Sequence, residues 1–280
     1  MMKSCVLVLC MLVCEPLFAR ELLYPNIDGV GEQSLGFAVL QLVIEKSGTD
    51  MTAVVDTREV NQNRMRQLVE NNELDLFDTG FDETLEGRFT PIYLPIEMGL
   101  LGWRLFIIHK DTQKKISQVE NLAELTKFVM GQGQGWGDIR ILQAAGLKVT
   151  TAPRIETLIQ MIGGKRFDLF PLGANEVYQF LETYRGNQPD IVVDDSIVLI
   201  YPYGRFFYVR LGDDELALML TRGLEQSFED GSLQALLASH PFSKDAFLKA
   251  NLNQRTQIRI PSPILTESFN AIDDKWWFTP

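Results

Sequence analysis

The sequence repeats one pattern of residues, and this repeat constrains the fold more than any other feature. Residues 65–77 (MRQLVENNELDLF) and residues 158–170 (LIQMIGGKRFDLF) both place apolar residues at helical spacing before a short turn and an Asp-Leu-Phe strand. A helix that leads into an apolar strand is typical of α/β domains whose sheets are covered on both faces. Two copies predict two α/β lobes of similar construction, and small ligands tend to bind between domains.

The first 19 residues have the composition of a secretory signal peptide. Lys3 makes the start positive, residues 5–13 are apolar, and residues 17–19 (LFA) are compatible with a cleavage site. The apolar run is too short for a membrane anchor. A lipid-modified cysteine is disfavoured because no small residue precedes Cys10 or Cys14. We therefore expect residues 1–19 to be cleaved and the mature protein to be exported to a bacterial periplasm.

The cysteines and the net charge exclude several kinds of site and partner. All three cysteines (Cys5, Cys10, Cys14) lie in the expected leader, so the mature chain has no disulfide, thiolate metal site or cysteine nucleophile. The formal net charge is −11, and cleavage leaves it unchanged because Lys3 and Glu15 leave together. Nucleic acids and anionic membranes require a basic surface, so neither is expected as a partner.

Strands and helices alternate along the mature chain, which predicts parallel sheets connected by crossover helices. Strand-like runs at residues 103–109 and 205–210 bracket the middle third. We expect an α/β fold with two lobes, each a mostly parallel sheet flanked by helices, joined by two crossing strands. The first lobe would comprise residues 20–108 and 206–280, and the second lobe residues 109–205.

Two local signals predict where helices of the second lobe begin. Ser117 and Glu120 are spaced as a capping box before an apolar series, so we expect a helix from there to about Lys127. Asn175 precedes apolar residues at helical spacing, so we expect it to cap the following helix, with a direct role in ligand binding as the alternative.

The order of these elements resembles the periplasmic solute-binding proteins of family 3, which have a type 2 periplasmic-binding-protein-like fold. Short segments resemble a proteobacterial branch of this family: 99–104 (GLLGWR), 131–138 (GQGQGWGD), 141–142 (IL), 146–147 (GL), 166–171 (RFDLFP), 175–176 (NE) and 230–232 (DGS). The resemblance covers essentially the whole mature chain. It implies a monomer that binds a small polar solute between its lobes and delivers it to a membrane transporter or sensor.

The chain departs from the resemblance at the arginines. Amino-acid binders of the family usually carry an arginine before the phrase that corresponds here to residues 89–93 (FTPIY), but this chain has Thr84 and Leu85 there. Relatives in the branch tend to carry arginine where this chain has Leu172. Only Arg88 lies close by. Because arginine binds carboxylates in a bidentate manner, its absence makes a free amino acid a less favoured ligand.

Candidate ligand-binding residues lie where strands end, since ligands of open α/β sheets bind outside the carboxyl ends of the strands. The glycine-rich segment 131–137 between a strand and a helix could present backbone amides to an anion, or it could be only a tight turn. We expect Trp136 and this loop on one wall, with Asp78, Thr79 and Arg88 on the other. The full set of expected ligand-binding residues is Asp78, Thr79, Arg88, Trp103, Gln132, Gly133, Trp136, Asp138, Asn175, Glu176 and Tyr201.

Nothing in the sequence has the pattern of a catalytic or metal site. There is no Gly-x-Ser-x-Gly, the glycine-rich segment matches neither a dinucleotide fingerprint nor a phosphate loop, and His109 and His240 have no metal-ligand spacing. We therefore expect no enzyme activity, no metal and no cofactor. Two alternatives stay open: a sensory or partner-binding module of the same fold, and a periplasmic lyase-like enzyme that uses cleft carboxylates.

Overall fold

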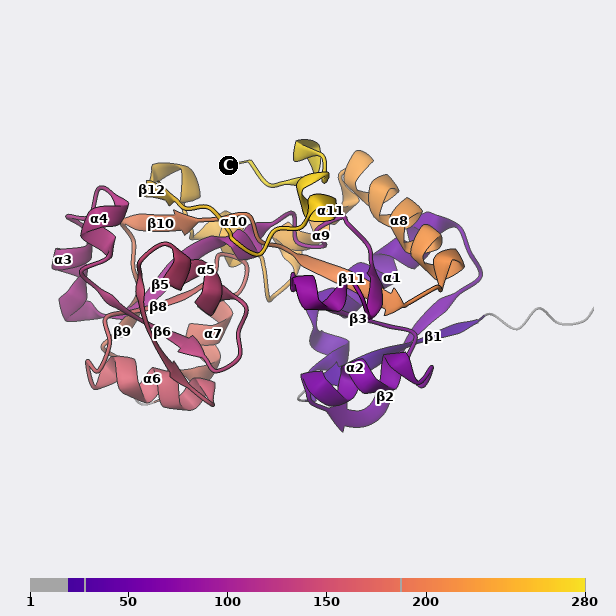
Figure 1. Cartoon of the computed structure of the whole chain (residues 1–280), viewed down its shortest axis with the longest axis horizontal. Helices are drawn as coiled ribbons and strands as arrows, with labels where there is room; N and C mark the ends of the chain where they lie inside the picture. Colours follow the sequence, from indigo (N-terminus) through magenta and orange to yellow (C-terminus); the bar gives the residue numbers. More distant parts are fainter. Residues whose placement is uncertain (1–19, 28, 187, 280) are drawn as a thin grey trace, which may run out of the picture.

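A computed structural model describes residues 20–27, 29–186 and 188–279. The expected signal peptide, residues 1–19, lies outside these residues. The described chain forms two α/β lobes that lie side by side, as the sequence predicts (Figure 1). None of the described helices combines the length and apolar character needed to cross a membrane.

The first lobe is built on two small sheets. β1 and β2 pair in parallel, and β11 pairs antiparallel with both β3 and β4. The first copy of the repeated pattern forms α2 and β3. The strands are β1 (Glu21–Ile27), β2 (Thr52–Val60), β3 (Leu76–Gly80), β4 (Phe89–Pro91) and β11 (Arg205–Arg210), and the helices are α1 (Leu35–Ser47), α2 (Gln62–Glu70), α8 (Asp214–Glu229) and α9 (Ser232–Ser239).

The second lobe is built on one seven-stranded sheet in the order β12-β10-β5-β8-β6-β7, with β9 also paired to β5. The second copy of the repeat forms α6 and β8. The strands are β5 (Trp103–His109), β6 (Val129–Gly133), β7 (Lys148–Ala152), β8 (Leu169–Gly173), β9 (Ile191–Val193), β10 (Ile197–Ile200) and β12 (Thr256–Arg259). The helices are α3 (Gln113–Ile116), α4 (Leu122–Leu125), α5 (Asp138–Ala144), α6 (Ile155–Gly163), α7 (Val177–Tyr184) and α10 (Asp245–Leu248).

Strand directions are more mixed than the expected parallel sheets. β6 pairs in parallel with β7 and β8, whereas β5 runs antiparallel to β8, β9 and β10. β5 enters the second lobe from the first, and β11 begins where the chain returns. Each therefore runs against the strands beside it. The repeated helix–strand units still supply the parallel part of the second sheet, through β8.

The lobes are joined by three segments of chain, one more than expected. Residues 92–102 lead from β4 to β5, residues 201–204 lead from β10 to β11, and residues 260–266 lead from β12 to α11 (Glu267–Asn270). β12 pairs with β10 in the second sheet, whereas α11 packs Phe269 on Phe81 of the first lobe. The assignment of residues 206–280 to the first lobe stays a prediction. The pairing of β12 with β10 places β12 itself in the sheet of the second lobe.

Two expected helix starts are wrong. Ser117 does not open a helix but ends α3, and α4 begins five residues later at Leu122, where the Asn121 side chain caps the helix by accepting a hydrogen bond from the Glu124 N–H. Asn175 does not cap α7, because the residue at the cap position is Glu176. In both places a polar residue suited to a turn stands close to the true helix start, so local sequence alone indicates the region but not the residue.

Candidate functional site

A buried ionic cluster lies at the end of the second lobe that faces the first. Arg104 of β5 forms an ion pair with Asp138, the first residue of α5, and its Nη1 lies 3.5 Å from Glu176 Oε1. Its Nε donates a hydrogen bond of 2.7 Å to the Tyr201 hydroxyl, which in turn donates one of 3.0 Å to Asp138. We call Arg104, Asp138, Glu176 and Tyr201 the second-lobe cluster.

Burial dominates the electrostatics of this cluster. Burial raises the pKa of Glu176, and the positive charges of Arg104 and Arg205 oppose that rise. Burial also raises the pKa of Tyr201 well above its ordinary value, so this hydroxyl stays protonated and can donate to Asp138. For Arg104, burial acts to lower the pKa and is the largest single influence, but the charges of Asp138 and Glu176 together with Tyr201 and Tyr203 outweigh it, and the pKa is raised. Arg104 is thus a permanent cation whose charge is neutralised inside the protein.

A second cluster lies on the facing side of the first lobe. Asp78 of β3 accepts a hydrogen bond from the Tyr24 hydroxyl and a 2.8 Å hydrogen bond from Arg205 Nη1, which is also an ion pair. The backbone N–H of Arg205 donates to both oxygens of Glu97, at 2.9 and 3.0 Å. We call Tyr24, Asp78, Glu97 and Arg205 the first-lobe cluster.

Local structure explains how Asp78 and Glu97 are held. Gly36, in the first turn of α1, has no side chain, and a Cβ there would overlap both Asp78 and Tyr24. Glu97 is fully buried in the first segment that joins the lobes. Burial raises its pKa to about 7, although the Arg205 N–H and charge act in the opposite direction. Glu97 belongs to the joining segment 92–102, and Arg205 directly follows the joining segment 201–204. The hydrogen bonds between them therefore hold these two segments together.

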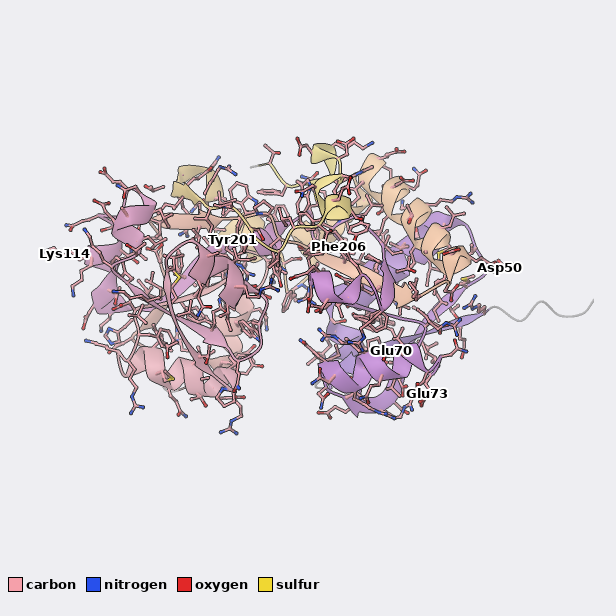
Figure 2. All side chains as sticks on the ribbon, viewed as in Figure 1. Asp50, Glu70, Glu73, Lys114, Tyr201 and Phe206 are labelled. Atoms are coloured by element: carbon pink, nitrogen blue, oxygen red, sulfur yellow. The ribbon has the colours of Figure 1, made fainter. Side chains whose placement is uncertain are left out.

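The two clusters meet at the junction between the lobes. The Tyr203 ring lies in the joining segment 201–204, with the guanidinium of Arg104 5.4 Å from its centroid. Its hydroxyl occupies the space beside Gly80 of β3. Figure 2 labels Tyr201 and Phe206 on either side of this junction. Near it, Arg140 of α5 forms an ion pair with Glu83 of the first lobe. We call the two clusters together the junction cluster.

The structure brings four of the expected ligand-binding residues into the junction cluster: Asp78, Asp138, Glu176 and Tyr201. All four are buried. They come from four separate places in both lobes, namely β3, α5, the residue before α7 and the joining segment that follows β10. Their approach to one another supports the expectation that the strand ends face a common site, while their role in binding stays a prediction.

Three other expected residues, and Gly133 with them, make packing or ion-pair contacts that account for their positions without a ligand. Arg88 forms a surface ion pair of 2.8 Å with Glu70. Trp103 packs edge-on against Phe278 of the C-terminal tail, with ring centroids 5.7 Å apart. Trp136 stacks on Phe170 at 6.2 Å and covers Gly133, where a Cβ would overlap its ring.

The remaining expected residues make no side-chain hydrogen bond or ion pair with the junction cluster in the described chain. Thr79 pairs with Phe206 in the sheet and is half-buried. The Gln132 Nε2 donates 3.3 Å to the Pro171 carbonyl, and its buried Oε1 has no hydrogen-bond partner among the described residues. Asn175 is 2% exposed, and within the described chain neither its Nδ2 nor its Oδ1 has a partner.

The sequence interpretation missed the two arginines that organise the cluster. Arg104 stands inside the apolar run that becomes β5, and Arg205 opens the run that becomes β11. A charged residue within a buried strand requires an opposite charge nearby, because an unpaired buried charge is very costly. This signal was present in the sequence, but it could not identify the partners, which come from distant elements.

Two hollows of the described surface lie away from the junction. One of about 420 Å³ and one of about 240 Å³ adjoin each other on the first lobe, share Glu32 and Val55, and contain no residue of the junction cluster. Within the described chain, no three His, Cys, Asp or Glu side chains come together in a way that could hold a metal ion. The junction cluster is the candidate site because buried charged side chains from both lobes come together there.

Comparison with solved structures shows which proteins share this fold. An ancestral arginine-binding protein bound to arginine is 13% identical, with a TM-score of 0.55, over 79% of this chain and 98% of that one. A histidine kinase sensor domain with similarity to periplasmic binding proteins is 13% identical, with a TM-score of 0.58, over 80% and 96%. The amino acid ABC transporter substrate-binding protein AbpA from Streptococcus pneumoniae, bound to L-arginine, is 13% identical, with a TM-score of 0.54, over 82% and 95%.

These neighbours are binding proteins and a sensor domain rather than enzymes, and they confirm the two-lobed periplasmic-binding-protein-like fold. No family model matches the chain, and no curated protein sequence matches it.

Proposed function

We propose that this protein binds a small polar solute between its two lobes. The observation that carries the proposal is the junction cluster, in which charged side chains from both lobes meet where the lobes are joined. Burying charges is costly even when they are paired, so stability alone does not account for this cluster. Joining segments that are short and few allow the lobes to move about the junction, and a solute that contacts both lobes would favour their closed arrangement.

The fuller form of the proposal follows the resemblance to family 3 solute-binding proteins. The chain would be an exported, periplasmic monomer of a proteobacterial branch and would deliver its solute to a membrane transporter. The arginine-bound neighbours support an amino acid or a related molecule as the first class of solute to test. Gln132 and Asn175, with side-chain atoms that lack partners in the described chain, would supply polar contacts from the second lobe.

A thermal-shift screen of the mature chain, residues 20–280, tests the proposal. L-arginine, L-glutamine and the other standard amino acids come first, followed by sugars, polyamines and short peptides. A solute at about 100 times its Kd adds roughly 2.7 kcal/mol to the free energy of unfolding, which raises Tm by several degrees. A binding solute should also decrease the radius of gyration in small-angle scattering. If no solute shifts Tm, the proposal is wrong.

A sensory module is the second candidate. The histidine kinase sensor domain resembles this chain as strongly as the transport proteins do. In that case the two lobes would act on a membrane-bound signalling partner, with or without a solute. Pull-down of a membrane kinase, together with loss of its signalling when the gene is deleted, would favour this function over delivery to a transporter.

A further inference from the structure

The outer edge of β2 is open in the described chain. β2 pairs in parallel with β1, and no other described strand pairs with it. The Thr52 N–H donates 3.0 Å to the carbonyl of Arg20 and therefore faces β1. Because backbone groups point alternately to the two sides of a strand, the N–H and C=O groups of Ala53 and Val55 face away from β1. These groups form an open edge with which an added strand would pair.

An apolar hollow of about 420 Å³ lies beside this edge, between α1 and β2. It is lined by Glu32, Phe37, Gln41, Ala53, Val54 and Val55. Two of the five exposed large apolar side chains of the described chain, Val30 and Val54, belong to the same region. Residues 52–55 contain neither a charge nor a proline, the features that usually prevent an edge strand from pairing. The surface is therefore suited to an extended segment with apolar side chains.

The charge around the hollow is negative. Glu32 lines this hollow and the adjoining one of about 240 Å³, which Asp56 lines as well. The cation of β2, Arg58, is already paired with Asp56 at 2.6 Å and with Glu73 at 2.9 Å. Neither Glu32 nor Glu59, farther along β2, forms an ion pair with another described residue. Positive side chains of a partner would therefore be attracted to this surface.

We propose that the β2 edge, defined as residues 52–60 with the adjoining hollow, binds an extended basic segment of another protein, which adds to the sheet as a strand. The open groups of Ala53 and Val55 supply main-chain hydrogen bonds, and alternate apolar side chains of the segment fill the hollow. Its lysine or arginine side chains pair with Glu32 and Glu59. A second copy of this chain fits less well, because its net charge of −11 and its own acidic residues would bring like charges together.

The β2 edge contains no residue of the junction cluster, so this proposal does not depend on solute binding. Calorimetric titration of residues 20–280 with the end-blocked peptide KVKVKVK tests it. One comparison peptide, EVEVEVE, reverses the charge. The other is KVKVKVK with every backbone amide N-methylated, which keeps the side chains and the charge but has no backbone donor. KVKVKVK should bind roughly tenfold more tightly than either, since binding needs both charge and main-chain pairing.

Three variants locate the interaction on the chain. Ala53→Pro removes an N–H of the open edge but none that faces β1, and proline is tolerated in that position of an edge strand. It should weaken binding of KVKVKVK roughly tenfold. Glu32→Lys leaves the backbone unchanged and should weaken binding several-fold. Glu120→Lys makes the same change of charge at an exposed position of the second lobe and should leave the affinity unchanged.

Hydrogen exchange measured by NMR on the wild-type chain gives an independent test. KVKVKVK should slow the exchange of the Ala53 and Val55 amides and leave the second lobe unaffected. Absence of binding, equal binding of the N-methylated peptide, full affinity in Ala53→Pro, or protection confined to other residues would overturn the proposal. Dimers of the wild type in sedimentation experiments that Ala53→Pro abolishes would assign the edge to a second copy and would also overturn it.

Discussion

At the scale of single residues, the protein buries charged side chains where apolar side chains of similar volume would serve stability as well. Arg104 and Asp138 are both almost fully buried, and replacing a buried ion pair by apolar residues is often neutral or stabilising. Arg205 and Asp78 form a second pair whose arginine is only partly covered. Arg104 is thus paired on several sides within the protein, whereas Arg205 pairs with Asp78 alone through its side chain among the described residues.

Glu97 should make the stability of the protein depend on pH. Its pKa rises from 4.5 to about 7 on folding because the carboxyl is buried. The folded state therefore holds the proton more tightly. The contribution of Glu97 to the free energy of unfolding should therefore fall by about 3 kcal/mol as the pH rises from about 4.5 to 7.

The variant Glu97→Gln keeps an acceptor for the Arg205 N–H but has no proton to lose. Urea unfolding across this pH range should show that its advantage over the wild type grows as the pH rises. Glu70→Gln, at a surface carboxylate, serves as the control. A constant difference between Glu97→Gln and the wild type would show that Glu97 does not titrate in this window.

At the scale of elements, the site depends on how α1 approaches β3. Gly36 lies in the first turn of α1, and Asp78 Cγ is 2.6 Å from where its Cβ would be. Alanine is favoured over glycine inside a helix by about 1 kcal/mol, so any loss of stability from a substitution there must be steric.

Gly36→Ala should therefore destabilise the protein by about 1–3 kcal/mol and weaken solute binding, because Asp78 and Tyr24 must move. The matched control is Gly87→Ala, since no atom lies within 4 Å of its added Cβ. That variant should stay within about 0.5 kcal/mol of the wild type. Chemical denaturation and the thermal-shift assay measure the two effects. Equal stability of both variants would show that α1 does not fix Asp78.

The glycine-rich segment 131–137 contributes to the junction cluster only through the residue that follows it. Trp136 folds back over Gly133 and stacks on Phe170, which accounts for a large aromatic residue in a loop without a ligand. Asp138 directly follows the segment, is the first residue of α5 and forms an ion pair with Arg104. The contribution of the segment to the junction cluster therefore comes from the residue at the helix start.

At the scale of the whole molecule, the C-terminal tail connects to the junction. The Phe278 N–H donates 2.7 Å to the Met98 carbonyl, and the Trp277 ring occupies the space that a side chain at Gly99 would need. Met98 and Gly99 both belong to the joining segment 92–102. The tail thus packs on the segment about which the lobes would move.

Trp277→Ala should lower stability by about 2 kcal/mol, since the lost side chain is half-buried, and broaden the distribution of distances between the lobes. Because residues 20–280 contain no cysteine, spin labels can be placed at Glu70→Cys and Lys114→Cys, which lie on different lobes (Figure 2). Trp276→Ala is the control, because Trp276 packs on Phe228 of the first lobe. Identical distance distributions in all three proteins would show that the tail does not restrain the junction.

The sequence alone determined the two-lobed α/β architecture, because the repeated helix–strand pattern and the alternation of elements are local properties of the chain. It also pointed to four residues that the structure brings together in the junction cluster, since polar residues after apolar strands mark the strand ends; their role in binding stays a prediction. The mixed strand directions, the third joining segment and the partners of Arg104 and Arg205 were decided only by the tertiary structure. The physical reason is that burial, and the pairing of charges that burial requires, depends on residues far apart in the chain: Arg104 with Asp138, Arg205 with Asp78.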